Sequence, residues 1–200
     1  MQRGHRVSVR TIAIGSTIVA LGAILGPLHV ITLNASPSMP LGLYVRSFQP
    51  IHIGSIVSVC PPLAARRFLA DRDNTTDTLS FTPWCPDGAT PFLKSVAALP
   101  GDSVVVQRDG VHVNSHPALP GSQPLIYVLR KNTREKIRLP ALTSAHIHIP
   151  KGDIWAYSPT WNSFDSRYYG PVVPLVTLAP LMLLPWEHAL SPPRAIAIVR

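Results

Sequence analysis

Ser36-Pro37-Ser38-Met39-Pro40 stands directly after a long apolar segment, and this boundary divides the 200-residue chain into two unequal parts. No Asp, Glu, Lys or Arg occurs in residues 11–45, and residues 12–33 are largely Ile, Val, Leu, Ala and Gly. About 20 apolar residues in a helix suffice to cross the hydrocarbon core of a bilayer. We therefore predict one transmembrane anchor over residues 11–33, followed by a folded domain.

Arginines at the start of the chain predict the orientation of this anchor. Arg3, Arg6 and Arg10 precede the apolar segment, and such residues remain on the cytoplasmic side of a membrane. Residues 1–10 are thus expected to be a cytoplasmic basic N-terminus, with the domain in the periplasm, at the inner membrane of a bacterium. The alternative is a cleavable signal peptide. The signal peptide is disfavoured because a cut after Ala35 would have Leu33 at a position where such cleavage sites need a small residue. The apolar run is also long for the apolar region of a signal peptide.

The composition of the remaining chain favours a mostly β domain. The chain has 22 prolines, about twice the usual share, and proline interrupts helices and central strands. We predict an antiparallel β-rich domain over residues 34–186, a flexible C-terminal tail over residues 187–200, and no long amphipathic helix besides the anchor. The apolar segment 171–186, which contains four prolines, is expected to pack on the domain or lie on the bilayer. Strands are predicted at 53–59, 103–106, 111–113, 125–129 and 153–157, and Asp109-Gly110 indicates a hairpin between the second and third.

One serine and one lysine suggest a chemistry for this domain. A serine hydroxyl is a weak nucleophile until a base accepts its proton. Lysine can be that base if burial lowers its pKa, and Lys94 lies in an apolar run, between Leu93 and Val96. Ser38 follows the predicted anchor. Taken alone, Lys94 is more simply a lysine at a strand edge with its amine in water, and Ser38 a serine that bonds the local backbone.

Five short motifs carry a resemblance that decides between these interpretations. They are Ser36-Pro37-Ser38-Met39, Pro40-Leu41-Gly42-Leu43-Tyr44, Gly54-Ser55-Ile56-Val57, Lys94-Ser95-Val96-Ala97-Ala98-Leu99-Pro100-Gly101-Asp102 and Asn162-Ser163-Phe164-Asp165-Ser166-Arg167-Tyr168-Tyr169-Gly170. In this order, behind an apolar segment, they resemble the membrane-bound type I signal peptidases. The second motif resembles the conjugative-transfer (TraF-type) branch of that family.

The resemblance implies roles for individual residues. Ser38 matches the nucleophile and Lys94 the general base. The Ser36 hydroxyl and the Ser38 backbone N–H match an oxyanion hole, in which one donor is typically worth about 3 kcal/mol. Ser163 matches the serine that hydrogen-bonds the lysine. Asp165 has two open roles, as a third catalytic group or as the structural ion-pair partner of Arg167.

Two departures from the family pattern affect the loops near the site. The last motif is usually preceded by Gly-Asp-Asn, whereas this chain has Ser158-Pro159-Thr160. Ser95 replaces the arginine that commonly follows the lysine. Neither change removes a catalytic group, so the resemblance still implies an active enzyme.

The two cysteines, Cys60 and Cys85, are candidates for a disulfide because a periplasmic domain is in an oxidising compartment. The bond would close a polar loop and contribute roughly 3 kcal/mol. Two unpaired buried thiols are the alternative.

The sequence gives less support to other functions. The net charge of +8 suggests nucleic acid, but the basic cluster of residues 130–138 contains no aromatic residue, so no nucleic-acid partner is predicted. That cluster is a solvated loop or touches anionic lipid. His112, His116, His146 and His148 lack a third ligand or a supporting Glu, so no metal and no cofactor are predicted.

The sequence thus predicts a membrane-bound Ser-Lys endopeptidase that removes signal sequences from exported precursors, with a bilayer as its second partner. The branch implies a propilin or another component of a conjugation or type IV secretion apparatus, with small residues beside the cut. A non-catalytic membrane-anchored assembly factor is the alternative. The substrate, cyclisation of a pilin and the oligomeric state stay open. A self-cleaving repressor is excluded because no helix-turn-helix pattern is present.

Overall fold

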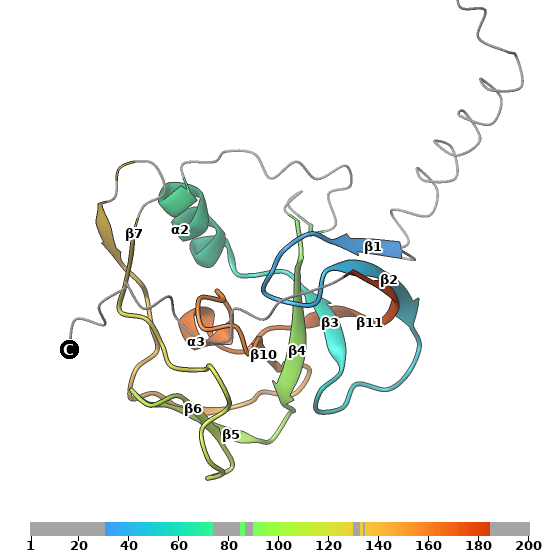
Figure 1. The fold of residues 1–200 in the computed structure, drawn as a ribbon. Coiled ribbons are helices and arrows are strands. Elements are labelled where there is room, and N and C mark those ends of the chain that lie inside the picture. The colour runs from blue at the N-terminus through green and yellow to red at the C-terminus, as the bar shows by residue number, and fades with distance from the viewer. Residues whose placement is uncertain (1–30, 74–84, 87–89, 130–132, 134, 185–200) are drawn as a thin grey trace, which may run out of the picture.

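The computed structural model describes residues 31–73, 85–86, 90–129, 133 and 135–184 (Figure 1). Most of the predicted anchor lies outside these residues, as do the N-terminus and the C-terminal tail. Residues 31–33, which we assigned to the end of the anchor, instead begin strand β1 (Ile31–Asn34). Any anchor helix therefore ends before Ile31. Across the described ranges we find no helix with the length and apolar character needed to span a membrane.

A six-stranded antiparallel sheet forms the larger part of the fold. Its strands lie in the order β1-β2-β11-β3-β4-β10. The bounds of the five strands after β1 are β2 (Gly42–Ser47), β3 (Ile56–Val59), β4 (Phe92–Ala98), β10 (Trp155–Tyr157) and β11 (Pro174–Leu183). Every neighbouring pair is antiparallel, which agrees with the predicted fold class.

Strand β11 corrects the prediction for the apolar segment 171–186. We expected this segment to pack on the domain or lie on the bilayer, but β11 is a strand of the sheet itself, paired with β2 on one side and β3 on the other. Proline cannot donate to a ladder, so it occurs at strand starts and bulges. Pro174 is the first residue of β11, and the register shifts between Pro180 and Met182. The two prolines thus occupy the positions that a central strand tolerates.

The predicted hairpin belongs to a second sheet. This sheet has the order β6-β5-β9, formed by β5 (Ser103–Val106), β6 (Val111–Val113) and β9 (His146–His148). A separate two-stranded ribbon joins β7 (Tyr127–Leu129) to β8 (Lys136–Arg138). In Figure 1 the β5–β6 hairpin and β7 lie away from the β1–β2 edge of the large sheet.

Two helices complete the described fold. Helix α2 (Leu63–Asp73) was not predicted, since we expected no long amphipathic helix besides the anchor and the 11 residues of α2 have only a weak apolar stripe. It follows Pro61-Pro62, and proline is favoured at the start of a helix. Its Ala65 is buried in a cluster with Leu139, Phe164 and Tyr168. Helix α3 (Ser166–Tyr169) is a single turn within the last motif.

Buried apolar side chains join the two sheets. Ala97 and Ala98 of β4 pack with Val104 and Val106 of β5 and with Trp155 of β10. A second cluster, which includes Val57 and Val96, lies beside it on the large sheet. Strand β4 is therefore held on both sides by strands and over its length by core side chains, which makes it a rigid support for Lys94.

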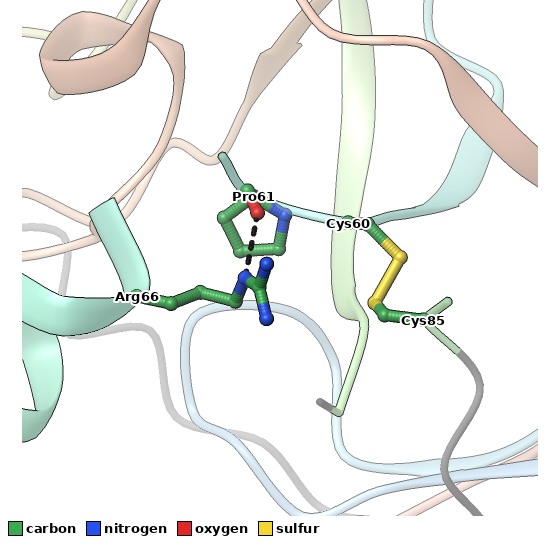
Figure 2. The surroundings of a disulfide bond; sticks show 4 residues. All are labelled: Cys60, Pro61, Arg66 and Cys85. Atoms are coloured by element: carbon green, nitrogen blue, oxygen red, sulfur yellow. Dashed lines mark hydrogen bonds between the residues drawn. A yellow bond between two sulfur atoms is a disulfide. The ribbon is translucent and has the colours of Figure 1, made fainter. Parts of the chain in front are cut away.

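A disulfide joins Cys60, directly after β3, to Cys85 (Figure 2). The alternative of two unpaired thiols is therefore wrong. Beside the bond, Arg66 Nε donates to the Pro61 carbonyl at 2.9 Å, which ties the first turn of α2 to the segment that follows β3.

Candidate active site

Ser38 lies on the loop that joins β1 to β2, residues 35–41, which we call the serine loop. Ser38 is half-buried and Ser36 is exposed. Their hydroxyl oxygens are 3.1 Å apart, and the Ser38 backbone N–H points at Ser36 Oγ from 3.5 Å. The two groups assigned to an oxyanion hole are therefore neighbours.

Lys94 is the third residue of β4 and is only 3% exposed. It pairs with Val57 of β3, so its side chain shares a sheet face with Val57 and with Val96. The amine nevertheless has two polar partners. Lys94 Nζ donates to Ser38 Oγ at 3.1 Å and to Ser163 Oγ at 3.0 Å. The fold thus brings Ser38, Lys94 and Ser163 together from distant parts of the sequence.

Burial changes the protonation of Lys94. Loss of hydration lowers its pKa from 10.5 to about 8. The negative charge of Asp165 opposes this change, and the positive charge of Arg167 adds to it. Burial is the largest of these three influences on the pKa of Lys94. Near neutral pH a useful fraction of this amine is therefore free to accept a proton.

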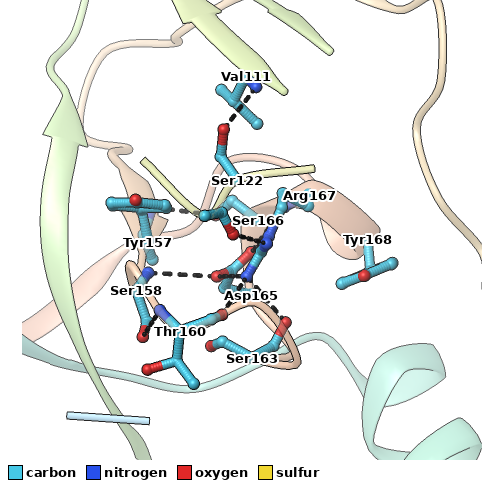
Figure 3. Close-up of polar contacts among 12 residues, drawn as sticks. Val111, Ser122, Tyr157, Ser158, Thr160, Ser163, Asp165, Ser166, Arg167 and Tyr168 are labelled. Atoms are coloured by element: carbon cyan, nitrogen blue, oxygen red, sulfur yellow. Dashed lines mark hydrogen bonds and ion pairs between the residues drawn. The ribbon is translucent and has the colours of Figure 1, made fainter. Parts of the chain in front are cut away.

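Asp165 and Arg167 form a fully buried ion pair at the start of α3 (Figure 3). Arg167 Nε and Nη2 each lie 2.8 Å from a carboxylate oxygen of Asp165. The backbone N–H groups of Ser158 and Arg167 also donate to this carboxylate, at 3.2 and 3.1 Å. Each oxygen of Asp165 thus accepts two hydrogen bonds. Asp165 acts on Lys94 through its charge and not through a hydrogen bond.

Arg167 also fixes the loop between β10 and α3, residues 158–165, which we call the arginine loop. Its Nη2 donates to the carbonyls of Thr160 and Ser163 at 3.2 and 3.0 Å, and Figure 3 shows both groups around the guanidinium. Its Nη1 donates to the Gly121 carbonyl at 2.8 Å. The ion pair therefore holds the backbone of Ser163, whose hydroxyl contacts Lys94.

The arginine loop contacts Ser38 as well. The Ser158 hydroxyl donates to the Ser38 carbonyl, and Thr160 Oγ1 lies 3.3 Å from the same oxygen. Ser158 and Thr160 belong to the three-residue segment that stands where the family usually has Gly-Asp-Asn. The substituted segment thus supplies hydroxyl groups that hold the backbone of Ser38.

The structure gathers most of the predicted site residues and adds others. Ser36, Ser38, Lys94 and Ser163 form one connected polar group, with the ion pair behind it. Sequence reasoning missed Asn34, Ser158 and Thr160, all buried and bonded to the serine loop; the unusual Ser-Pro-Thr segment was the available signal for the last two. The disulfide residues belong to another region. Within the described ranges, no three His, Cys, Asp or Glu side chains gather as metal ligands.

Comparisons with known proteins extend these observations. A family model for signal peptidase, peptidase S26, matches residues 4–179. A conjugal transfer protein TraF of Agrobacterium tumefaciens (strain 15955) is 33% identical over 142 residues, which cover 70% of this chain and 73% of that protein. A plasmid transfer protein TraF of Escherichia coli is 30% identical over 169 residues, covering 82% and 89%. A crystal structure of a signal peptidase I from Enterococcus faecalis V583 aligns at 19% identity with a TM-score of 0.34, covering 66% of this chain and all of that one.

Proposed function

This chain belongs to the signal peptidase (peptidase S26) family, and from that premise we propose that it is a serine endopeptidase in which Ser38 is the nucleophile and Lys94 the general base. The observation that carries the proposal is the 3.1 Å contact between Lys94 Nζ and Ser38 Oγ, made by a lysine that is 3% exposed. A base within hydrogen-bond reach of the proton that it accepts is the first requirement of such catalysis.

The proposed reaction proceeds in two stages. Lys94 accepts the Ser38 proton as Ser38 Oγ attacks the scissile carbonyl, and the amine of the departing fragment takes that proton as the peptide bond breaks. Water then attacks the acyl-enzyme while Lys94 accepts its proton; the ester bond to Ser38 breaks, Ser38 Oγ takes that proton from Lys94, and the acyl fragment leaves as a free acid. With a pKa of about 8, roughly a tenth of Lys94 is neutral at pH 7. Ser163 orients the amine by accepting one of its hydrogen bonds.

Ser36 supports the transition state in this proposal. The carbonyl oxygen becomes negative as Ser38 attacks, and hydrogen-bond donors aimed at that oxygen stabilise it. The Ser36 hydroxyl and the Ser38 N–H lie together on the serine loop and can serve as those donors. Asp165 is assigned a supporting role, since four donors already occupy its carboxylate; it keeps Arg167 and the arginine loop in place.

The proposed substrate is a precursor protein with an apolar signal sequence and small residues beside the cut. Relatives of this chain are called conjugal or plasmid transfer proteins, which supports a propilin or another transfer component as the precursor. A non-catalytic assembly factor of such an apparatus is the outcome that the experiment below distinguishes from an enzyme.

An exposed apolar surface supports a bilayer as the second partner. It lies where β1, β2 and β11 run side by side: Leu33 of β1 and Met182 of β11 pair with Leu43 of β2 from opposite sides. Leu33 is 68% exposed and Met182 52%. Ile31 of β1, Leu181 and Leu183 of β11, and Leu184 directly after β11 are exposed as well. We propose that the N-terminal segment anchors the chain in a bacterial inner membrane, that the domain is periplasmic, and that this surface touches lipid.

Cleavage of a co-expressed precursor tests the proposal. The precursor has an apolar segment followed by Ala-Xaa-Ala, and its processing is compared in wild type, Ser38→Ala and Lys94→Ala. Ser47→Ala and Lys151→Ala, at exposed or half-buried positions outside the site, are the matched controls. The proposal expects processing by wild type and both controls, and none by the two site variants at equal protein levels. Processing by either site variant contradicts the Ser-Lys mechanism. No processing by wild type favours the assembly factor.

A further inference from the structure

Asn34, the last residue of β1, is a buried amide at the entrance of the serine loop. It is 7% exposed, although it directly precedes a loop whose residues Ala35, Ser36 and Pro37 are all exposed. Burying an amide is costly unless its polar atoms are hydrogen-bonded. The partners of Asn34 therefore indicate what this side chain does.

Every described hydrogen bond of the Asn34 side chain goes to the serine loop. Its Nδ2 donates to the carbonyls of Ser36, Met39 and Pro40 at 3.1, 3.0 and 2.9 Å. Its Oδ1 accepts the Ser36 backbone N–H at 3.1 Å. The amide thus binds the chain on both sides of Ser38 and sets the distance between the two ends of the loop.

A few described hydrogen bonds besides those of Asn34 also hold the backbone of the serine loop. The Met39 N–H donates to the Ser36 carbonyl at 3.4 Å, and Tyr44 Oη donates to the Pro40 carbonyl at 2.6 Å. The arginine loop holds the Ser38 carbonyl from the opposite side. Without the Asn34 amide, the three carbonyls lose their common donor, and the long 3.4 Å bond from Met39 to Ser36 is left to hold the curvature of the loop from within.

We propose that Asn34 is a positioning residue that holds the serine loop in the shape that aims Ser38 Oγ at Lys94 Nζ. This inference rests on the proposed function, because it assigns to Asn34 the geometry of that dyad. Asn34 donates to backbone carbonyls and contacts no reacting atom. Its loss therefore lowers the rate of the chemical step without changing the protonation of Lys94.

Asn34→Leu is the sharpest variant, because leucine has nearly the same branched shape without the polar atoms. Asn114→Leu is the control. Asn114 also bonds through both ends of its amide, to Asp102 Oδ1 at 2.8 Å and to the Ser103 N–H at 2.9 Å, but it is exposed and directly follows β6, away from the serine loop. Asn34→Gln retains the donor on a longer side chain. All are full chains purified in detergent, assayed with a synthetic peptide that carries an apolar segment and Ala-Xaa-Ala.

The proposal expects kcat to fall by about 10- to 100-fold in Asn34→Leu, since a misplacement of about 1 Å costs on this order. KM stays within about twofold, the midpoint of the pH–rate profile stays near the wild-type value, and Asn34→Gln recovers part of the rate. Asn114→Leu keeps its kcat whatever its effect on thermal stability. A proportional loss of kcat and of stability in both Leu variants overturns the proposal, because it shows a merely structural role.

Amide hydrogen exchange gives a readout that needs no substrate. In Asn34→Leu we expect faster exchange confined to the peptide that covers residues 35–41, with β4 protected as in wild type. Unchanged exchange of this peptide, or faster exchange throughout the large sheet, overturns the proposal. Because this measurement stands without cleavage, failure of the proposed peptidase function and failure of the Asn34 assignment are distinguishable.

Discussion

Ser38 and Lys94 meet at 3.1 Å, but the chain supports them differently. Ser38 lies half-buried on a loop beside the exposed Ser36, whereas Lys94 lies on a central strand with 3% exposure. A nucleophile has to be reached by an extended substrate, so it belongs on an accessible loop. A lysine base has to lose its proton near pH 7, so it belongs in a dry interior. Hydrogen bonds then hold the loop that carries Ser38 against the strand that carries Lys94.

Removing Arg167 is expected to have the largest effect. It acts on the buried part of the site, around Lys94 and Asp165, and lowers the stability of the fold. Arg167→Met leaves the Asp165 carboxylate buried without its counter-charge, and breaking such a pair costs about 3–5 kcal/mol. The measurement is urea unfolding of the full chain in detergent, followed by tryptophan fluorescence. Arg138→Met, at an exposed position of β8, is the control. The double variant Asp165→Asn with Arg167→Met should recover part of the loss; an unfolding free energy unchanged in Arg167→Met would show that the pair contributes little.

A change on the exposed serine loop is expected to affect the rate of cleavage and not the stability of the fold. Ser36→Ala removes a proposed oxyanion donor, and the loss of such a donor lowers kcat by about 100- to 1,000-fold. Because Ser36 is exposed, thermal unfolding should stay near the wild-type temperature. Steady-state cleavage of the Ala-Xaa-Ala peptide measures this, with Ser47→Ala of β2 as the control. A loss below threefold would remove Ser36 from the proposed oxyanion hole.

Lys94→Met is expected to abolish cleavage and yet stabilise the fold at neutral pH. The pKa of Lys94 in the native state, about 8, lies below its ordinary value of 10.5. The charged form of Lys94 therefore destabilises the native state below pH 8. That penalty is about 3 kcal/mol, against about 1 kcal/mol for each lost hydrogen bond, so the variant gains roughly 1–2 kcal/mol at pH 7.

The sign of this effect depends on pH. Between the two pKa values the unfolded chain holds more protons than the native one, so wild-type stability rises with pH from about 8 to 10.5. The advantage of Lys94→Met therefore shrinks over this range and reverses above it, where only the cost of the lost hydrogen bonds remains. Urea unfolding at pH 7 and pH 10.5, with the exposed Lys151→Met as control, measures it. Destabilisation at pH 7 would contradict the account of Lys94 as a desolvated amine.

Ser163 connects the arginine loop to Lys94, and its substitution is expected to have the smallest effect. Ser163→Ala removes one hydrogen bond of Lys94 but leaves the contact with Ser38, so kcat should fall by about tenfold. Ser122→Ala is the control, since Ser122 is as deeply buried and bonds the Val111 N–H and the Leu119 carbonyl. Equal kcat in Ser163→Ala and wild type would show that Ser163 does not orient Lys94.

The sequence predicts those parts of the molecule that short motifs determine. The β5–β6 hairpin follows from Asp109-Gly110 between β-branched runs, and the antiparallel sheet follows from short strands separated by turn residues. The serine and lysine motifs located Ser38 and Lys94 because the family resemblance carries their order along the chain. Proximity of the two, across 56 positions, is a property of the fold and not of either motif.

Other features depend on tertiary context that no local pattern records. The prolines of β11 looked like interruptions, but one starts the strand and the other lies at a bulge, so the strand remains central. Helix α2 has a weak apolar stripe, and only the cluster around Phe164 reveals which side it buries. Ser158 reaches Ser38 across 120 positions, so the unusual Ser-Pro-Thr segment could mark this loop as a departure but could not show which backbone group the Ser158 hydroxyl binds.

The pH dependence of cleavage tests the central claim most directly, namely that burial makes Lys94 a base for Ser38. For wild type and the Ala-Xaa-Ala peptide, log(kcat/KM) should rise with unit slope as the amine loses its proton and then level off, with a midpoint near pH 8. The free enzyme's essential base sets that midpoint. A midpoint near 10.5, or a rate that does not change between pH 6 and 10, would contradict the account.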